Sequence, residues 1–315
     1  MPRTGASGRA LRCHDLEVTA DPPPAPGEWV RPEVYGAGPV RTGPCGMCGT
    51  DGPLSRSHVP PQGVGNRHLV ARSSLVSGEG GAQPSRPNDG GMHVPGLCAS
   101  CNGLAGTWDP GYIELHGALG PPLWAETPLH LPEFLAPRRS LIHVGAAARS
   151  MLAAACALNP MIRTRTCPDL PKLLAEPDPF ELPSELDLRI ACATGCRARI
   201  TGGMRGAYGR GLGREREPIG ESTIAQAHYA LVAWQLVHKG RADRLDFQRW
   251  PSIGSWTETP TADAVALDDV CDALPVVPLA LDEPVDGDGW LEVFASTNCF
   301  IVLCDDIAPE LRAQP

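Results

Sequence analysis

The chain has 315 residues, a length sufficient for two domains and a sizeable core. Its formal net charge is −9. Its 35 glycines and 34 prolines, with only 5% aromatic residues, indicate many turns and long connections. Twelve cysteines would suit a disulfide scaffold, but no charged segment followed by an apolar one opens the chain, so we expect a cytoplasmic protein with reduced thiols. The most apolar helix-length stretch, 141–158, contains His143 and Arg149 and is too short and too polar to cross a bilayer, which argues against a membrane partner.

The sequence predicts three regions in chain order. Residues 1–38 are rich in Pro and Gly and are predicted to form an extended arm. Residues 39–120 form a module that carries two cysteine pairs, and residues 121–315 are predicted to form a C-terminal α+β domain with an acidic end. The expected fold class is therefore α+β.

Two cysteine pairs are the strongest signal in the chain. Cys45 and Cys48 enclose two residues, as do Cys98 and Cys101, and glycines and prolines surround both pairs. A two-residue spacer in a tight turn directs two thiolates at one ion, and four such thiolates suit a tetrahedral Zn²⁺. A redox pair or unrelated thiols remain the alternative, although no thioredoxin-like pattern surrounds the pairs.

The residues around the pairs form a longer motif. The first pair is followed by Gly49 and then by Ser57-His58-Val59-Pro60, while the second follows Gly90-Gly91-Met92-His93 and precedes Asn102. This arrangement resembles the HNH endonucleases, the ββα-metal nucleases, in the branch with a four-cysteine zinc site. The resemblance covers about residues 40–115, and its motifs are specific only in combination.

The resemblance implies a role for three further residues. His58 would be the general base that deprotonates the attacking water, a task that suits an imidazole with a pKa near neutrality. Asn102 would be a ligand of a catalytic Mg²⁺ or Mn²⁺, because these cations prefer oxygen donors. His93 stands where the family has an Asn that braces the loop carrying the base, and could form a similar hydrogen bond or act as a ligand.

The chain departs from the family at one position that bears on activity. Ser57 stands where the family has an acidic metal ligand before the catalytic His. Four carboxylates in or near the module are candidate replacements, and the sequence does not choose among them: Asp51, Asp89, Asp109 and Glu114.

Other residues have simpler interpretations. Asn102 could also be a helix N-cap. His68, His116 and His143 show no ligand spacing and are interpreted as surface or packing residues. Cys192 and Cys196 enclose three residues and form a much weaker candidate for a second metal site.

The charge distribution bears on a nucleic-acid partner. From residue 261 onward twelve acidic residues face a single basic one, so the preceding 260 residues carry a net charge of about +2. Seven arginines lie between residues 189 and 216, and Arg197, Arg199 and Arg205 are our candidates for phosphate contacts with double-stranded DNA. The alternative is a solvated loop or an internal partner for the acidic end.

The remaining elements are predicted from periodicity and from breakers. Helices are expected over 139–159 and 222–239, and strands over 186–200, 290–295 and 300–304, with the last two forming a hairpin. Residues 77–91 are predicted to be a flexible excursion, and residues 121–137 a connector.

Together these patterns predict a metal-dependent HNH-type nuclease that hydrolyses phosphodiester bonds, DNA rather than RNA. The alternatives are a catalytically degenerate module that binds nucleic acid or a protein partner, and a nuclease-like scaffold that serves another hydrolytic or biosynthetic reaction. A protein partner would bind through the C-terminal domain.

Overall fold

The computed structural model describes part of the chain: residues 42–67, 72–75, 82–84, 90–124, 134–136, 139–176, 179–194, 199–208, 218–229, 231–239, 250–278, 290–293 and 300–302. Helices and strands are mixed within these residues, as the predicted α+β class requires. The predicted N-terminal arm, 1–38, lies outside them.

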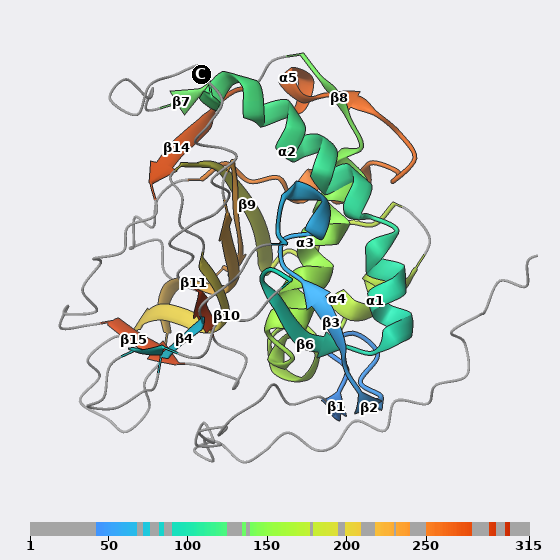
Figure 1. The fold of residues 1–315 in the computed structure, drawn as a ribbon, viewed down its shortest axis with the longest axis vertical. Helices are drawn as coiled ribbons and strands as arrows, with labels where there is room; N and C mark the ends of the chain where they lie inside the picture. The colour runs from blue at the N-terminus through green and yellow to red at the C-terminus, as the bar shows by residue number, and fades with distance from the viewer. Residues whose placement is uncertain are drawn as a thin grey trace, which may run out of the picture.

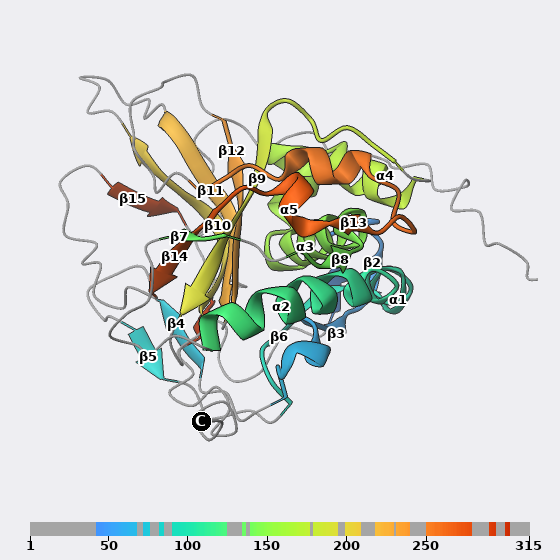
Figure 2. The same cartoon turned by 90° about the horizontal axis from the view of Figure 1, so that it is seen from above.

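Helix α3 (Val144–Leu158) is the centre of the molecule. Fourteen of its 15 residues are buried, so it is enclosed on all sides rather than amphipathic. Seven alanines and a glycine make it narrow, which lets neighbouring backbones approach closely. Figures 1 and 2 show it between a group of short elements on one side and a large sheet on the other.

The first side carries a strand pair followed by helices. β3 (Ser55–His58) and β6 (His93–Leu97) are antiparallel, with Ser57 opposite Val94 and His58 opposite His93. α1 (Ala99–Gly106) follows β6 directly and contacts both strands, giving the order strand, strand, helix. α2 (Asp109–Trp124) then packs along α3.

The other side is a seven-stranded sheet with the strand order β15-β10-β11-β12-β9-β14-β7. Its pairs are antiparallel except β14 with β9, which is parallel. The strands are β7 (Phe134–Leu135), β9 (Leu186–Thr194), β10 (Arg199–Tyr208), β11 (Pro218–Tyr229), β12 (Val232–His238), β14 (Leu274–Pro278) and β15 (Trp290–Val293).

Smaller elements complete the described chain. β1 (Thr42–Pro44) pairs with β2 (Asp51–Pro53), β8 (Leu141–Ile142) with β13 (Val265–Ala266), and β4 (Arg72–Leu75) with both β5 (Ala82–Pro84) and β16 (Phe300–Val302). The short helices are η1 (Gln62–Val64), η2 (Ile162–Thr166), α4 (Leu170–Ala175), η3 (Gly254–Glu258) and α5 (Leu267–Val270).

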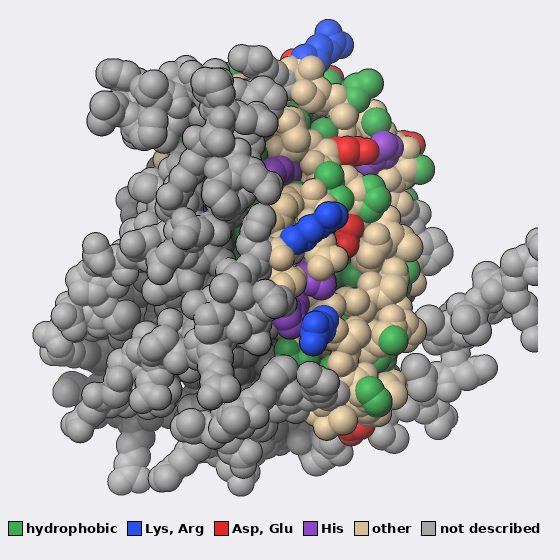
Figure 3. Space-filling model, in the orientation of Figure 1, with side chains coloured by type: hydrophobic (Ala, Val, Ile, Leu, Met, Phe, Trp, Pro, Cys, Tyr) green, Lys and Arg blue, Asp and Glu red, His purple; other side chains and the backbone are tan. Residues whose placement is uncertain are grey.

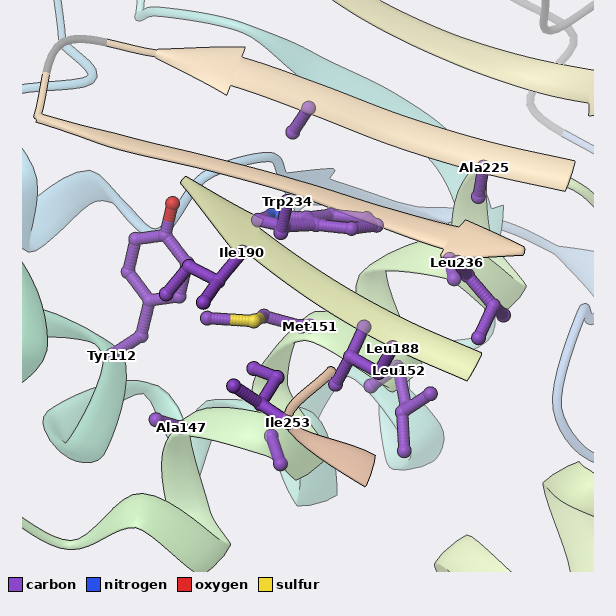
Figure 4. Packing of buried hydrophobic residues seen from close by; sticks show 14 of the residues in the cluster. Tyr112, Ala147, Met151, Leu152, Leu188, Ile190, Ala225, Trp234, Leu236 and Ile253 are labelled. Atoms are coloured by element: carbon purple, nitrogen blue, oxygen red, sulfur yellow. The ribbon is translucent and has the colours of Figure 1, made fainter. Parts of the chain in front are cut away.

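One hydrophobic cluster joins both sides of α3. It contains residues from Cys45 in the cysteine module to Leu274 in the sheet. Figure 4 shows Met151 and Leu152 of α3 against Ile190 and Leu188 of the sheet. All four side chains are fully buried. Burying a side chain of this size stabilises the fold by about 1.5–3 kcal/mol.

The predicted helix over 222–239 is wrong, because these residues form the end of β11 and the whole of β12. Leu231, with a φ of 76°, lies in the turn between the two strands. Six of the seven residues of β12 are buried, so its apolar run is not interrupted on either face and matches helical spacing by accident.

Other elements are partly as predicted. The helix over 139–159 is confirmed as α3 but begins at Val144, because residues 141–142 form β8. The strand over 186–200 is two strands, β9 and the start of β10. The strands near 290 and 300 are present, but their hairpin is wrong because β15 pairs with β10 and β16 pairs with β4.

Two predicted irregular segments also contain regular structure. β5 lies inside the predicted excursion over 77–91, most of which falls outside the described residues. α2 continues through Trp124, so the predicted connector does not begin at residue 121. Among the described helices, none is long and apolar enough to cross a membrane.

Candidate metal centre and adjoining pocket

The four predicted cysteine ligands lie together. The sulfur atoms of Cys45, Cys48, Cys98 and Cys101 are all within 4.8 Å of one another, and Cys48 Sγ lies 3.7 Å from Cys98 Sγ. This separation is too long for a disulfide and close to the edge of a tetrahedron with metal–sulfur bonds of about 2.3 Å. The four cysteines can therefore hold one metal ion such as zinc.

Two tight turns position the sulfurs. In the first, Gly49 has a φ of 76° and donates its N–H to the Cys45 carbonyl at 2.9 Å. In the second, Cys98 precedes α1, so that Cys101 lies in the first turn of the helix. The Cys98 N–H points at Cys45 Sγ at 3.3 Å and links the two turns, as does a hydrogen bond from Gly46 N to Gly96 O at 2.8 Å.

Two glycines let the turns pack against α3. A Cβ on Gly46 would overlap the carbonyl oxygen of Cys156, and a Cβ on Gly96 would overlap that of Ala157. Both overlaps are with helix backbone, which cannot move aside as a flexible side chain does. The cysteine cluster is thus attached to the central helix of the fold.

The hydrogen bonds within the cluster favour a thiolate at Cys45, whereas burial raises the pKa of Cys48 and the bond to Cys45 raises the pKa of Cys101. The Cys101 thiol donates to Cys45, and this bond, with the Cys98 N–H, lowers the pKa of Cys45 to about 4 against the opposing effect of burial. The thiolate is the form of cysteine that binds metals.

A pocket of about 140 Å³ opens next to the cluster, between β3, β6, α1 and α3, and the beginning of α2. It brings the predicted base His58 and the predicted ligand Asn102 to the same space. Its lining residues are Ser57, His58, Gln62, Leu97, Asn102, Ala105, Gly106, Asp109, Ser150, Ala153, Ala154 and Ala157.

His58, the last residue of β3, is half-buried in this pocket. Its Nε2 lies 3.1 Å from the Gly90 carbonyl oxygen and 2.9 Å from the Gln62 side-chain amide. The Gly90 carbonyl only accepts and the Gln62 amide nitrogen only donates, so the tautomer decides which of the two contacts is a hydrogen bond. With the proton on Nε2, the ring donates to Gly90 and Nδ1 keeps its lone pair. Burial lowers the pKa of His58, and repulsion from the Arg56 guanidinium lowers it further.

Arg56 is exposed on β3, two residues before His58. On the face drawn in Figure 3, basic and histidine side chains gather over the region of β3 and η1 (Figure 1). Arg56 thus places an exposed positive charge close to His58 in the chain.

His93 lies next to His58 but does not line the pocket. The two ring centroids are 5.6 Å apart, and Nδ1 of the buried His93 lies 3.0 Å from the Gly91 carbonyl oxygen. This contact is to the residue two positions before His93, on its own segment and not on the segment that carries His58.

Asn66 makes the cross-link that we expected from His93. It is 2% exposed, and its side-chain amide donates to the carbonyls of Pro60 and Met92 while its Oδ1 accepts the Met92 N–H. These bonds fix the segment after His58 to the start of β6. Nothing in the local sequence pattern marks Asn66 for this role, because its partner Met92 is distant in the chain.

Of the four candidate carboxylates, Asp109 alone lines the pocket within the described residues. Burial raises its pKa, against the hydrogen bond from Ser150 Oγ at 2.9 Å. Asp51 is exposed on β2, and Glu114 accepts hydrogen bonds from the ring and the backbone N–H of His143 at 2.7 and 3.0 Å. Asp89 lies outside the described residues.

Few of the remaining candidates can be located in detail. Arg199 and Arg205 lie on β10, whereas Arg197 and Cys196 fall outside the described chain. Arg189, from the same arginine-rich run, pairs with Asp187 at 2.7 Å. Cys192 is buried on β9.

No protein-family model, curated protein or solved structure matches this chain.

Proposed function

We propose that this protein is a metal-dependent endonuclease of the HNH type, which hydrolyses phosphodiester bonds in DNA rather than RNA. The observation that carries the proposal is the pocket, where His58 and Asn102 lie together beside the four-cysteine cluster. The preference for DNA comes from the resemblance alone.

Zinc on the four cysteines would have a structural role. Four thiolates occupy all four positions of a tetrahedral zinc ion and leave none for substrate. The hydrogen-bonded turns instead fix the start of α1, and Asn102 follows Cys101 directly. The cluster therefore holds Asn102 in place relative to β3 and its His58.

His58 would accept a proton from the attacking water. Its lowered pKa keeps the ring neutral at physiological pH, as a base requires, and the tautomer that donates to Gly90 would leave Nδ1 available. A Mg²⁺ or Mn²⁺ ion near Asn102 would stabilise negative charge on the phosphate. Exposed Arg56 beside His58 would attract the phosphate backbone, with Arg197, Arg199 and Arg205 as further candidate contacts.

Replacing His58 tests this function. Because a general base contributes about 10²- to 10⁴-fold to rate, His58→Ala should abolish Mg²⁺- or Mn²⁺-dependent cleavage of duplex DNA. Zinc content and thermal unfolding should stay unchanged. His143→Ala is the matched control, since His143 pairs with Glu114 outside the pocket lining and its loss should leave cleavage intact.

Wild-type protein that cuts neither DNA nor RNA with any divalent metal would overturn the proposal. If that protein still bound nucleic acid or a protein partner, the degenerate binding module would replace the nuclease.

A further inference from the structure

The pocket contains a carboxylate that the motif does not supply. Ser57 occupies the position of the family's acidic ligand, while Asp109 lies 51 residues beyond His58, at the first position of α2. Both residues line the same pocket as Asn102. The fold therefore supplies a carboxylate from α2 to a pocket where β3 contributes only the hydroxyl of Ser57.

Asp109 is held for a ligand on its open side. Ser150 of α3 donates to Oδ1 at 2.9 Å, and within the described residues Oδ2 has no protein partner. Oδ2 is not among the buried unpaired atoms of the described residues, so water or a cation can reach it. The Ser150 bond also restricts the direction in which the free oxygen can point.

Ser57 presents a second unused oxygen. Its side chain is 4% exposed, and its Oγ has no hydrogen-bond partner in the part of the chain that the structure describes. Buried hydroxyls are nearly always paired, so an unpaired one that lines a pocket is available to a water or to an ion there.

Asn102 supplies a third oxygen. Its Nδ2 lies 3.5 Å from the Arg56 carbonyl oxygen, so Oδ1 points away from that carbonyl. Among the described residues, no protein group binds this Oδ1. The three side chains come from β3, α1 and α2, and the tertiary fold brings them to the lining of one pocket.

We infer that Asp109, together with Asn102 and Ser57, forms the site of the divalent cation. One carboxylate, one amide oxygen and one hydroxyl make a hard, all-oxygen donor set of charge −1, which suits Mg²⁺ or Mn²⁺ and leaves positions for water and phosphate. The pocket of about 140 Å³ has room for several waters around the ion. The assignment rests on the proposed function for its link to catalysis, but the cation site itself can be measured without any nucleic acid.

Mn²⁺ binding to zinc-loaded protein, followed by electron paramagnetic resonance, tests the site. Wild-type protein should bind about one Mn²⁺ per chain, and Asp109→Asn should weaken binding at least tenfold at unchanged zinc content. Asp51→Asn and Glu114→Gln are matched controls, because each removes one negative charge from the same module outside the pocket lining, and both should stay within about twofold of wild type. Asp109→Glu, which keeps the charge, should retain part of the affinity.

A second measurement uses unmodified protein and does not depend on the folding of a variant. Fe²⁺ bound in place of Mn²⁺, with ascorbate and peroxide, should cut the chain near residues 57, 102 and 109. Cuts confined to other segments would overturn the inference, as would an Asp109→Asn variant with wild-type Mn²⁺ affinity.

The same data separate this inference from the proposed function. Mn²⁺ binding that depends on Asp109 in a protein without nuclease activity would sustain the cation site and refute the nuclease. Nuclease activity with a cation affinity that does not depend on Asp109 would sustain the nuclease and refute the cation site.

Discussion

The four-cysteine cluster and the neighbouring pocket use their side chains in opposite ways. The cluster has four identical soft ligands on two turns, within 4.8 Å of one another, and they can close around one ion. The pocket has different hard donors from three elements, with Ser57 Oγ lacking a protein partner among the described residues. A ligand set that fills every coordination position suits a structural ion, whereas one that leaves positions open suits an ion that binds substrate. The comparison implies that loss of the cluster should unfold the module, whereas changes in the pocket should affect chemistry.

The largest effect is expected from breaking the cluster. Cys98→Ser should lose the metal and cooperative unfolding together, because binding of structural zinc contributes about 10–16 kcal/mol in small zinc modules. Zinc analysis and a thermal unfolding curve measure both. A variant that loses zinc but keeps the wild-type melting temperature would show that the cluster does not hold the fold.

An intermediate effect is expected where the cluster meets α3. Gly96→Ala should destabilise the fold by about 1–3 kcal/mol or more, since its Cβ would overlap the Ala157 backbone. Gly103→Ala is the control, because Gly103 lies in α1 with open space around it, and alanine there should stabilise the helix by about 0.5–1 kcal/mol. Denaturant unfolding of both variants measures the difference, and equal effects would contradict the packing.

The cluster could be predicted from sequence and the pocket only in part, for a physical reason. Two-residue spacing confines a pair of thiols to one turn, so Cys45 and Cys48 carry their geometry locally. His58 and Asn102 were found through neighbouring motifs. The sequence offers Asp109 as one of four candidate carboxylates, and only the packing of α2 on α3 shows that it lines the pocket. Asn66 cannot be predicted from local sequence, because it binds Met92, 26 residues away.

The fold shows the same division. α3 is marked by apolar residues at helical spacing and by Pro160 after its end, although the first residues of the predicted helix belong to β8. β12 could not be distinguished from a helix, because a strand buried on both faces has no alternation to read. The partners of β15 and β16 depend on contacts with distant strands, so short turn signals between them predicted the wrong pairing.

The smallest effect concerns the pH dependence of the pocket. A base acts when neutral, and burial with Arg56 lowers the pKa of His58, so the acid limb of the cleavage rate should lie below pH 6.5. Arg56→Gln removes a repulsion that disfavours the imidazolium, so it should raise this pKa and move the limb to higher pH by a fraction of a unit.

Arg67→Gln also removes an exposed positive charge, but Arg67 is not among the groups that shift the pKa of His58, so this control should show no comparable shift. The Arg56 effect should also shrink as salt increases, because exposed charges are screened. An acid limb that does not respond to Arg56 at low salt would assign the limb to a group other than His58.

The central claim is that one pocket joins the base, the cation ligands and the scissile phosphate. A crystal of the zinc-loaded protein soaked with Mn²⁺ and a short DNA duplex tests it directly. We predict an anomalous Mn²⁺ peak at about 2.1 Å from oxygens of Asn102 and Asp109, with a phosphate bound to the ion and His58 in hydrogen-bonding reach of its water. An Mn²⁺ peak elsewhere, or a phosphate bound away from His58, would contradict the account.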